Sequence, residues 1–366
     1  MSKILNVAVV GCGEVAMTTH LPTLILNSHM YRTVALCDVS VKALEHCSRK
    51  FHIPATYTNI TQMLAERTEI DVVFILTANE YHAVNSIECM NAGKHVMIEK
   101  PMALSHRDAN AIEEARIKNG VVCFIAYMRR YATAFLRVKD MVKKSNSIRY
   151  VRVRDIIGNN AFFVEQSGTY PILIDDIPDS ANLDRTKKAK DIFRQALGEK
   201  AANPKEVMFW NLLNSLASHD LSAMRELIGM PQKVLSVARH AGPSGVFLSV
   251  HFQYETFAAY YEMAIDQIKK FDAHIEVFTD DKHLKVTYDT PYIKGLPITA
   301  TVLKTLSNGD FSEESIRPTY VDAYTLEYED LYGCIVHGNK VKTSPTDAMQ
   351  DLQIFDMIVE ACLPEF

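Results

Sequence analysis

Two residues of this sequence stand in local patterns that suit acid–base chemistry. His219 lies in NSLASHDLSAMRELIG, residues 214–229, where apolar residues recur at helical spacing and predict a helix with one buried face. Lys100 follows an apolar run in HVMIEKPMALS, residues 95–105. An imidazole accepts a proton near neutral pH, and an ammonium stabilises a developing negative oxygen. On its own His219 fits a packed side chain equally well, so the elements around both residues must decide between the two interpretations.

A glycine turn near the start of the chain predicts a dinucleotide site. LNVAVVGCGEVAMTTHL, residues 5–21, has the pattern of a strand, a turn and a helix, with Gly11, Gly13 and Ala16 spaced as in G-x-G-x-x-A. The first glycine permits a tight turn, the second lets a pyrophosphate approach the backbone, and the small third residue lets the helix pack on the strand. Glu14 and Val15 begin the helix, whose free N–H groups and positive end suit phosphates.

Asp38 is predicted to select the cofactor. It ends the second predicted strand, 25 residues after Gly13. A carboxylate at that place accepts hydrogen bonds from a ribose 2′-hydroxyl and repels a 2′-phosphate. NAD(H) is therefore the expected cofactor, and NADP(H) is the less favoured alternative.

The position of Lys100 at the end of a predicted strand indicates where it lies in the sheet. Glu99-Lys100-Pro101 lies at the carboxyl end of the fifth predicted strand, and open α/β sheets bind ligands outside those ends. We therefore expect Lys100 to point to where a nicotinamide would lie, with Glu99 beside the cofactor. The alternative is a surface lysine before a turn proline. No set of residues has the spacing of metal ligands, so no metal is expected.

The composition excludes several classes of protein. The chain has 366 residues, of which 48% are hydrophobic and 23% charged, and a formal net charge of −5. A mildly acidic chain gives no electrostatic footprint for nucleic acid or for an anionic membrane surface. We find no apolar run long enough for a membrane span and no pattern of a secretory signal. Seven dispersed cysteines without a CxxC pair favour reduced thiols, so a cytoplasmic protein is expected.

The first 127 residues alternate between strand and helix patterns, which predicts a doubly wound parallel sheet of the Rossmann type. The expected strands are Ile4–Val10, Thr33–Asp38, Ala55–Tyr57, Asp71–Thr77, His95–Glu99 and Val121–Ala126. The expected helices are Glu14–Asn27, Ser40–Phe51, Ile60–Glu66, His82–Ala92 and Ser105–Asn119.

Residues 128–366 are predicted to form a second, α+β domain with an open, mainly antiparallel sheet. A helix at Thr133–Lys144 precedes the alternating strand IRYVRVRDI, and five further strand-like runs follow: KVLSVARH, GVFLSVHFQY, TFAAYYEMAI, AHIEVFTD and HLKVTYD. The polar stretch 165–207 has the character of an insertion. Two helices, Tyr320–His337 and Thr346–Leu363, close the chain, and the alternative that they pack back on the first domain stays open.

The order of these motifs resembles the glucose–fructose oxidoreductase / inositol dehydrogenase / rhizopine-catabolism (GFO/IDH/MocA) family. The resemblance runs through the glycine turn, TANEYHA at residues 77–83, EKP, AYMRRY at residues 126–131 and the His-Asp helix to TSPTDAMQDLQIFDMIVEA. It implies a Rossmann domain followed by an α/β domain whose open sheet often makes oligomer contacts. A homodimer or homotetramer is therefore expected.

The resemblance also assigns site residues. The EKP lysine of the family sits beside the substrate hydroxyl and the nicotinamide, frequently before a cis proline, and corresponds to Lys100. The proton-exchanging histidine corresponds to His219. Thr77, Asn79 and His82 of TANEYHA are expected in the cofactor pocket, with packing as an equally good role for His82.

One position departs from the family pattern. Ser215 stands one helical turn before His219, where the family often has an aspartate. Ser215 and Asn214 can still orient substrate by hydrogen bonds, but neither raises the basicity of the imidazole. Asp220 is expected to make a structural polar contact.

Two further features keep two interpretations each. Tyr127 and the arginines Arg129 and Arg130 could bind a substrate anion, or the arginines could form a salt bridge between the domains. Asp175 and Asp176 of the insertion fit an acidic solvated loop better than a part of the site.

The leading hypothesis is an NAD-dependent oxidoreductase for a secondary alcohol or ketone of a sugar, polyol or cyclic diol. Hydride transfer from such a carbon needs a base for the hydroxyl proton, which His219 and Lys100 provide. Two alternatives remain. Some relatives use bound NAD for transient oxidation that enables elimination or hydrolysis, and a fungal repressor of the galactose regulon resembles the family but acts by protein binding.

Overall fold

The computed structural model describes residues 3–243 and 245–362. The chain divides into two compact units. The first takes the residues up to Tyr127 together with Thr169–Asn214 and Glu327–Leu352, and the second takes Met128–Gly168, Ser215–Leu326 and the residues from Gln353 onward. The first unit thus includes most of the stretch that has the character of an insertion, and parts of both closing helices.

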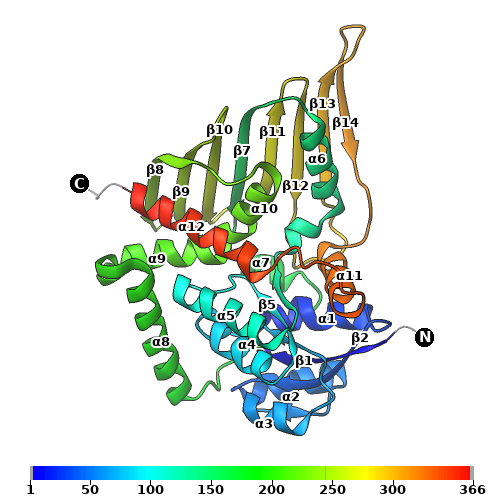
Figure 1. Ribbon diagram of the computed structural model, residues 1–366, viewed down its shortest axis with the longest axis vertical. Coiled ribbons are helices and arrows are strands. Elements are labelled where there is room, and N and C mark those ends of the chain that lie inside the picture. Colours follow the sequence, from blue (N-terminus) through cyan, green and yellow to red (C-terminus); the bar gives the residue numbers. More distant parts are fainter. Residues whose placement is uncertain (1–2, 244, 363–366) are drawn as a thin grey trace. The chain divides into compact units, whose positions relative to one another are not determined.

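The first unit contains a six-stranded parallel sheet in the order β3-β2-β1-β4-β5-β6, with helices along the chain between its strands (Figure 1). The predicted Rossmann sheet is confirmed, because all five strand pairings are parallel. The strands are β1 Leu5–Val10, β2 Tyr31–Cys37, β3 Thr56–Tyr57, β4 Val72–Ile75, β5 His95–Glu99 and β6 Cys123–Ala126. The helices are α1 Leu21–Leu26, α2 Val41–Phe51, α3 Ile60–Glu66, α4 His82–Asn91 and α5 His106–Asn119.

The direction of strand order reverses between β1 and β4, and this reversal creates the crevice for a ligand. The inner strands carry apolar residues on both faces, and every residue of β4 and β6 is buried. Main-chain hydrogen bonds join the glycine turn to both neighbours of β1, from Gly11 N to Cys37 O (2.8 Å) and from Leu76 N to Val10 O (2.7 Å). The glycine turn, Asp38 and the loop after β4 therefore lie together at the carboxyl edge of the sheet.

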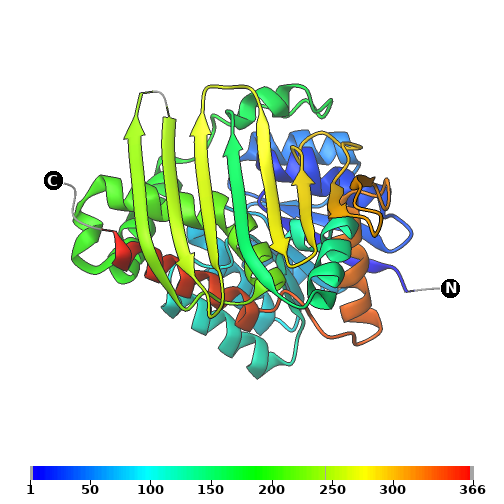
Figure 2. The ribbon, with the colours of Figure 1, turned by 90° about the horizontal axis from the view of Figure 1, so that it is seen from above.

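The second unit contains an eight-stranded sheet in the order β14-β13-β12-β11-β7-β10-β9-β8, whose strands lie side by side in Figure 2. Only β7 and β10 pair in parallel, so the predicted open, mainly antiparallel sheet is confirmed. The strands are β7 Ile148–Ile157, β8 Lys233–Gly242, β9 Gly245–Gln253, β10 Ala258–Asp266, β11 Phe271–Thr279, β12 Lys282–Tyr288, β13 Thr299–Thr305 and β14 Phe311–Ile316. The helix α6, Thr133–Lys144, has the bounds that the sequence predicts.

The stretch after β7 is more helical than the sequence suggests. It holds α7 Asn160–Glu165, α8 Asp179–Leu197, α9 Pro204–Leu212 and α10 Ser218–Ile228. The single helix predicted over 214–229 is wrong at its start, because a wide π-helical turn, Leu213–Ala217, joins α9 to α10. The closing helices are α11 Ala323–Val336 and α12 Pro345–Ala361.

One buried side chain and two polar contacts at the surface hold α8 and α9 to the rest of the first unit. The indole of Trp210, in α9, is buried and donates a hydrogen bond to Leu104 O (3.1 Å). Tyr81 donates from its hydroxyl to Asp184 of α8 (2.8 Å), and Arg185 pairs with Glu80 (3.2 Å). The insertion-like stretch is therefore an integral part of the first unit.

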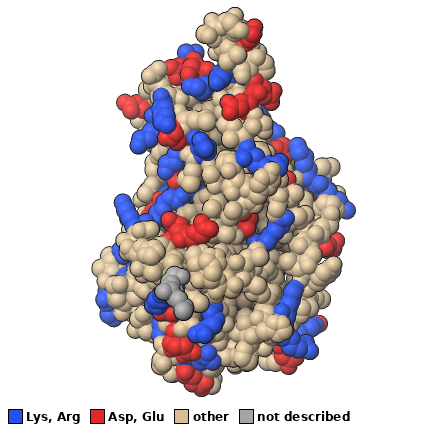
Figure 3. Space-filling view, turned by 90° about the vertical axis from the view of Figure 1, so that its right-hand side faces the viewer, with Lys and Arg blue, Asp and Glu red and all other residues tan. Residues whose placement is uncertain are grey.

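Charged side chains of both signs lie on the surface of the molecule (Figure 3). On the face shown in Figure 3, Lys and Arg side chains are interspersed with Asp and Glu. Among the described residues, no helix combines the length and the apolar character that crossing a membrane requires. Within the same residues, no group of His, Cys, Asp and Glu could hold a metal ion.

Candidate functional site

The glycine turn has the geometry that a dinucleotide requires. Gly11 has φ +97°, and a Cβ there would meet the main chain of Leu76 and Thr77 at 2.5–2.6 Å. A Cβ on Gly13 would have no atom within 4 Å, so this glycine borders open space. Ala16 is 1% exposed, at the place where the helix packs on the sheet. The turn therefore fits a pyrophosphate, with the N–H groups of Glu14 and Val15 at the helix start beside it.

The two glycines are expected to respond differently to alanine. Gly11→Ala forces a methyl group into the backbone after β4 and should lower the free energy of unfolding by about 2–4 kcal/mol. Gly13→Ala should change it by less than about 1 kcal/mol but weaken NADH binding about tenfold or more, because its methyl group fills the pyrophosphate approach. Urea denaturation and NADH titration of both variants check this pair. Equal effects of the two variants on stability would contradict it.

Asp38 follows β2 directly and faces the turn. Its carboxylate accepts hydrogen bonds from Cys12 N (2.6 Å) and Ser40 N (2.8 Å). Burial raises the pKa of Asp38, while these main-chain hydrogen bonds act in the opposite direction. The sequence prediction places a carboxylate at the ribose end of the site, and the structure has it beside the glycine turn.

A buried network holds the Glu99-Lys100-Pro101 turn at the end of β5. Glu99 accepts a hydrogen bond from Lys100 N (2.9 Å) and pairs with His20 Nε2 (2.9 Å), whose Nδ1 meets the hydroxyl of Tyr328 (2.7 Å). Burial opposes ionisation of Glu99, yet His20 and Lys100 bring its pKa below the usual range. Glu99 is therefore an anion that positions Lys100 rather than a direct cofactor ligand, and the Lys100–Pro101 bond is cis, as the family resemblance suggests.

His82 connects the ends of β4 and β5. Its Nδ1 lies 2.7 Å from Pro101 O and its Nε2 lies 3.0 Å from Thr77 O, and the ring is 1% exposed. Burial lowers the pKa of His82. Both ring nitrogens face main-chain carbonyls, so the ring holds the site together. Thr77 and Asn79 are half-buried in the loop after β4 and remain predicted cofactor contacts.

Ser215 and His219 lie in the second unit, one turn apart. Ser215 belongs to the π-helical turn and His219 to the first turn of α10, and both are half-buried. Asn214 is fully buried and donates to Trp210 O (2.9 Å) in the preceding helical turn. This bond engages the amide nitrogen of Asn214, and the substrate contact expected of Asn214 stays a prediction.

The arginine expected to bind a substrate anion is instead the centre of a buried ion cluster. Arg129, 3% exposed, pairs with Asp155 of β7 (3.0 Å) and with Asp220 of α10. All three residues belong to the second unit, so these ion pairs do not join the two domains, and the substrate contact expected of Arg129 stays a prediction. The polar contact predicted for Asp220 is this ion pair.

The remaining members of the tyrosine–arginine motif are also occupied. Arg130 pairs with Glu226 (2.5 Å), and Tyr127 donates from its hydroxyl to Asp351 (2.5 Å) with 2% of its surface exposed. The substrate contact expected of Tyr127 stays a prediction. The Tyr127 contact lies within the first unit and the Arg130 contact within the second, so each stabilises its own unit.

Asp220 predicts a pH dependence of stability. Burial and the neighbouring charge of Asp155 raise its pKa well above the usual 3.8, although Arg129 opposes them. Folding then favours the protonated form, so this contribution to stability is full below about pH 4 and is lost as the pH rises through the raised pKa. Asp220→Asn mimics the protonated acid. As the pH rises from about 5 to about 9, its free energy of unfolding should therefore fall less than that of wild type. Parallel stability curves from urea denaturation would contradict the assignment.

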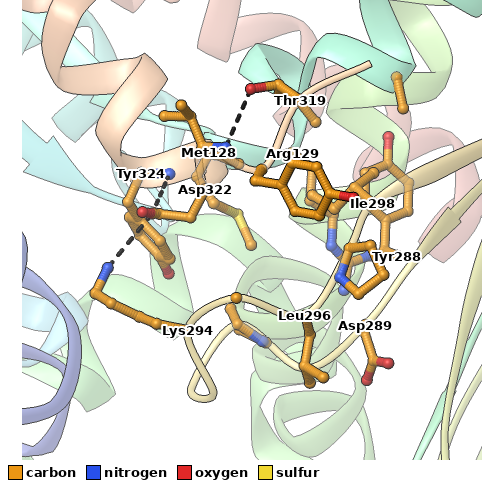
Figure 4. Close-up of a pocket in the computed structure, with 18 of the residues that line it drawn as sticks. Met128, Arg129, Tyr288, Asp289, Lys294, Leu296, Ile298, Thr319, Asp322 and Tyr324 are labelled. Carbon is orange, nitrogen blue, oxygen red and sulfur yellow. Dashed lines mark hydrogen bonds and ion pairs between the residues drawn. The ribbon is translucent and has the colours of Figure 1, made fainter. Parts of the chain in front are cut away.

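A pocket in the second unit lies beside Arg129 (Figure 4). Its volume is about 60 Å³, enough for a few water molecules but far below the roughly 300–1,000 Å³ of ligand sites. Lys294 points to Asp322 across its rim (3.4 Å), and Tyr288 stacks under the guanidinium at 5.2 Å. This pocket belongs to the packing of the second unit.

Comparison with known proteins identifies the first domain. Residues 5–127 match the oxidoreductase family with the NAD-binding Rossmann fold. Over these residues, about a third of the chain, the sequence therefore matches the model of the GFO/IDH/MocA family. The part that matches the family carries the glycine turn, Asp38, the loop after β4 and the Glu99-Lys100-Pro101 turn, so the predicted NAD-binding fold is confirmed.

Individual proteins are similar to this chain over part or nearly all of its length. Inositol 2-dehydrogenase of Salmonella typhimurium strain LT2 is 31% identical over 139 residues, which are 38% of this chain and 41% of that protein. The chain thus aligns with about two fifths of the length of such curated relatives. Myo-inositol 2-dehydrogenase of Lactobacillus plantarum covers 98% of this chain and 97% of its own with a TM-score of 0.69 at 18% identity. The dehydrogenase WlbA of Bordetella pertussis, solved with NADH and UDP-GlcNAcA, covers 98% and 96% with a TM-score of 0.67 at 16% identity. The two structural likenesses show the fold, which extends through the second unit.

Sequence reasoning missed His20 and Asp155. His20 follows the glycine turn by seven residues and reaches Glu99, a contact across 79 positions of the chain. Asp155 sits on a buried position of β7, and an aspartate inside an otherwise apolar inward row is the signal that pointed to a partner.

Proposed function

We propose that this protein is an NAD(H)-dependent oxidoreductase that transfers a hydride between nicotinamide and a secondary alcohol or ketone of a sugar, polyol or cyclic diol. One observation carries the proposal. The open glycine turn, Asp38 and Lys100 lie at the carboxyl edge of one parallel sheet, where such folds bind dinucleotides. A cofactor held there would bring its reactive end to the lysine.

Each residue in the proposed mechanism has one role. The bound nicotinamide supplies hydride acceptance and donation. Lys100, fixed through Glu99 and His20, stabilises the oxygen of the substrate as it loses its proton. His219 takes the hydroxyl proton, and Ser215 orients substrate or imidazole by a hydrogen bond. Lys100 belongs to the first unit and His219 to the second, so their convergence on one substrate is part of the proposal.

The substrate class comes from the relatives. Inositol, the substrate named for the Salmonella enzyme, is a cyclic polyol. A homodimer or homotetramer that uses the open face of the eight-stranded sheet completes the proposal, together with a cytoplasmic location, which the seven dispersed cysteines without a CxxC pair support.

A panel assay tests the function. Purified protein is incubated with NAD and a series of inositols, aldoses, linear polyols and diols, and absorbance of the reduced nicotinamide is followed. The reverse reaction is assayed with NADH and the matching ketones. We expect turnover with at least one cyclic polyol or sugar. Tight NADH binding without turnover on any member of the panel would contradict the enzymatic proposal.

Ser215 favours examining one alternative reaction. Ser215 supplies no carboxylate one turn before His219, where family dehydrogenases often have one to orient the imidazole. A transient oxidation by bound NAD could then serve elimination or hydrolysis with no net redox change. Bond cleavage in the product without accumulation of NADH would identify this reaction.

A further inference from the structure

An acidic segment, residues 169–178, lies against the start of α2 in the first unit. The carboxylate of Asp176 accepts hydrogen bonds from the Ser40 hydroxyl and from Lys42 N (2.9 Å). Asp175 forms an ion pair with Lys42 Nζ (2.7 Å), and Lys50 donates to Thr169 O from the other end of the helix. Asp175 and Asp176 therefore contact the start of α2 although they lie more than 130 positions away in the sequence.

The start of α2 is the ribose end of the predicted cofactor site. Ser40 caps α2 and also donates its main-chain N–H to Asp38, the carboxylate expected at the ribose hydroxyls. A 2′-phosphate on that ribose would need donors and positive charge at this place. The donors are the Ser40 hydroxyl, the Lys42 N–H and the Lys42 ammonium. Asp175 and Asp176 engage all three.

We propose that Asp175 and Asp176 are cofactor-specificity residues, which occupy the phosphate-binding donors at the start of α2 and exclude NADP(H). The inference rests on the proposed dinucleotide site and adds a second layer of selection to Asp38. The Asp175–Lys42 pair is exposed, with 61% and 46% of the side chains accessible, so it contributes little to stability. The acidic segment acts instead through its charge. The carboxylates of Asp38, Asp175 and Asp176 and the ammonium of Lys42 surround the expected position of the 2′-phosphate.

The hydrogen bonds at α2 keep Asp176 charged. They lower the pKa of Asp176, with the Ser40 bond contributing most. The charge of Asp176 in turn adds to the burial that raises the pKa of Asp38. A further negative group between these two carboxylates would meet repulsion from both.

The test compares Asp175→Asn/Asp176→Asn with wild type in titrations of NADH, NADPH and adenosine 2′,5′-bisphosphate. We expect the double variant to bind NADPH and the bisphosphate at least about tenfold more tightly, with the affinity for NADH changed by less than about threefold. The gain should shrink at high salt because it is electrostatic. Asp179→Asn is the control for a general charge effect, since it removes one carboxylate three residues after Asp176, on an exposed position at the start of α8.

The outcomes separate this inference from the proposed function. An unchanged NADPH affinity in a double variant that still binds NADH would overturn the specificity role alone. Failure of wild type to bind either dinucleotide would overturn both. An equal gain in the Asp179→Asn control would show a general charge effect and would also overturn the assignment to the start of α2.

Discussion

Lys100→Met is expected to lower kcat by about 10²–10⁴-fold on whichever substrate the wild type oxidises. The variant keeps the length and apolar stem of the side chain but removes the charge that stabilises the developing alkoxide. The dissociation constant for NADH should change by less than about fivefold, because the glycine turn and Asp38 hold the other half of the cofactor. Steady-state kinetics and NADH titration of the same preparation measure both effects.

The matched control for this prediction is Lys118→Met. Lys118 is exposed in the last turn of α5, so its loss removes the same charge from the same unit without touching the cofactor edge. Lys100→Arg should recover only a small part of the activity, since a planar guanidinium cannot take the place of a compact ammonium. A Lys100→Met enzyme as fast as the control would remove Lys100 from the mechanism.

Arg129→Met is expected to lower the free energy of unfolding of the second unit by about 3–5 kcal/mol. The guanidinium is the shared ion-pair partner of Asp155 and Asp220, which are 0% and 1% exposed. Removing it leaves two carboxylates together in a medium that solvates them poorly. Circular dichroism during urea denaturation reports the loss, while fluorescence of Trp210, the single tryptophan, reports the first unit.

Two further variants test whether the loss of stability comes from the buried ion cluster. Lys144→Met breaks an exposed pair with Asp140 on α6 of the same unit, and should cost about 0–1 kcal/mol. Adding Asp155→Asn and Asp220→Asn to Arg129→Met should restore part of the lost stability, because the uncompensated charges disappear. Equal losses for Arg129→Met and Lys144→Met would show that the cluster does not stabilise the second unit.

The sequence predicts the cofactor half of this protein because its signals are local. Gly11, Gly13 and Asp38 lie within one strand–turn–helix–strand unit, and each is constrained by the chain on either side of it. The alternation of apolar strands and amphipathic helices then gives the parallel sheet. Lys100 follows from the same reasoning, because the ends of parallel strands share one edge.

The partners of Tyr127 and Arg129 could not be predicted for the opposite reason. A polar side chain next to a predicted site is equally suited to a ligand and to a partner distant in sequence. The carboxylates that occupy Tyr127 and Arg129 lie 224 positions away for Asp351, and 26 and 91 positions away for Asp155 and Asp220. No local pattern marks such pairs.

The edge of the second sheet escaped prediction for a different physical reason. β13 and β14 are largely polar, and β14, FSEESI, is mostly exposed at the edge of the sheet. Such strands bury few side chains, so they lack the apolar alternation on which strand prediction depends. The sequence likewise predicts a solvated loop at Asp175 and Asp176, because only the fold brings Asp176 to Ser40.

Isotope transfer tests the central claim most directly. The protein is incubated with unlabelled NAD and a polyol deuterated at its carbinol carbons, chosen from the substrates that the panel reveals, and the reduced cofactor is examined by mass spectrometry. Direct hydride transfer predicts that each molecule of reduced nicotinamide carries one deuterium from the substrate carbon, and that Lys100→Met forms it far more slowly. Product formation without deuterium in the cofactor would contradict the claim that this protein is a hydride-transferring dehydrogenase.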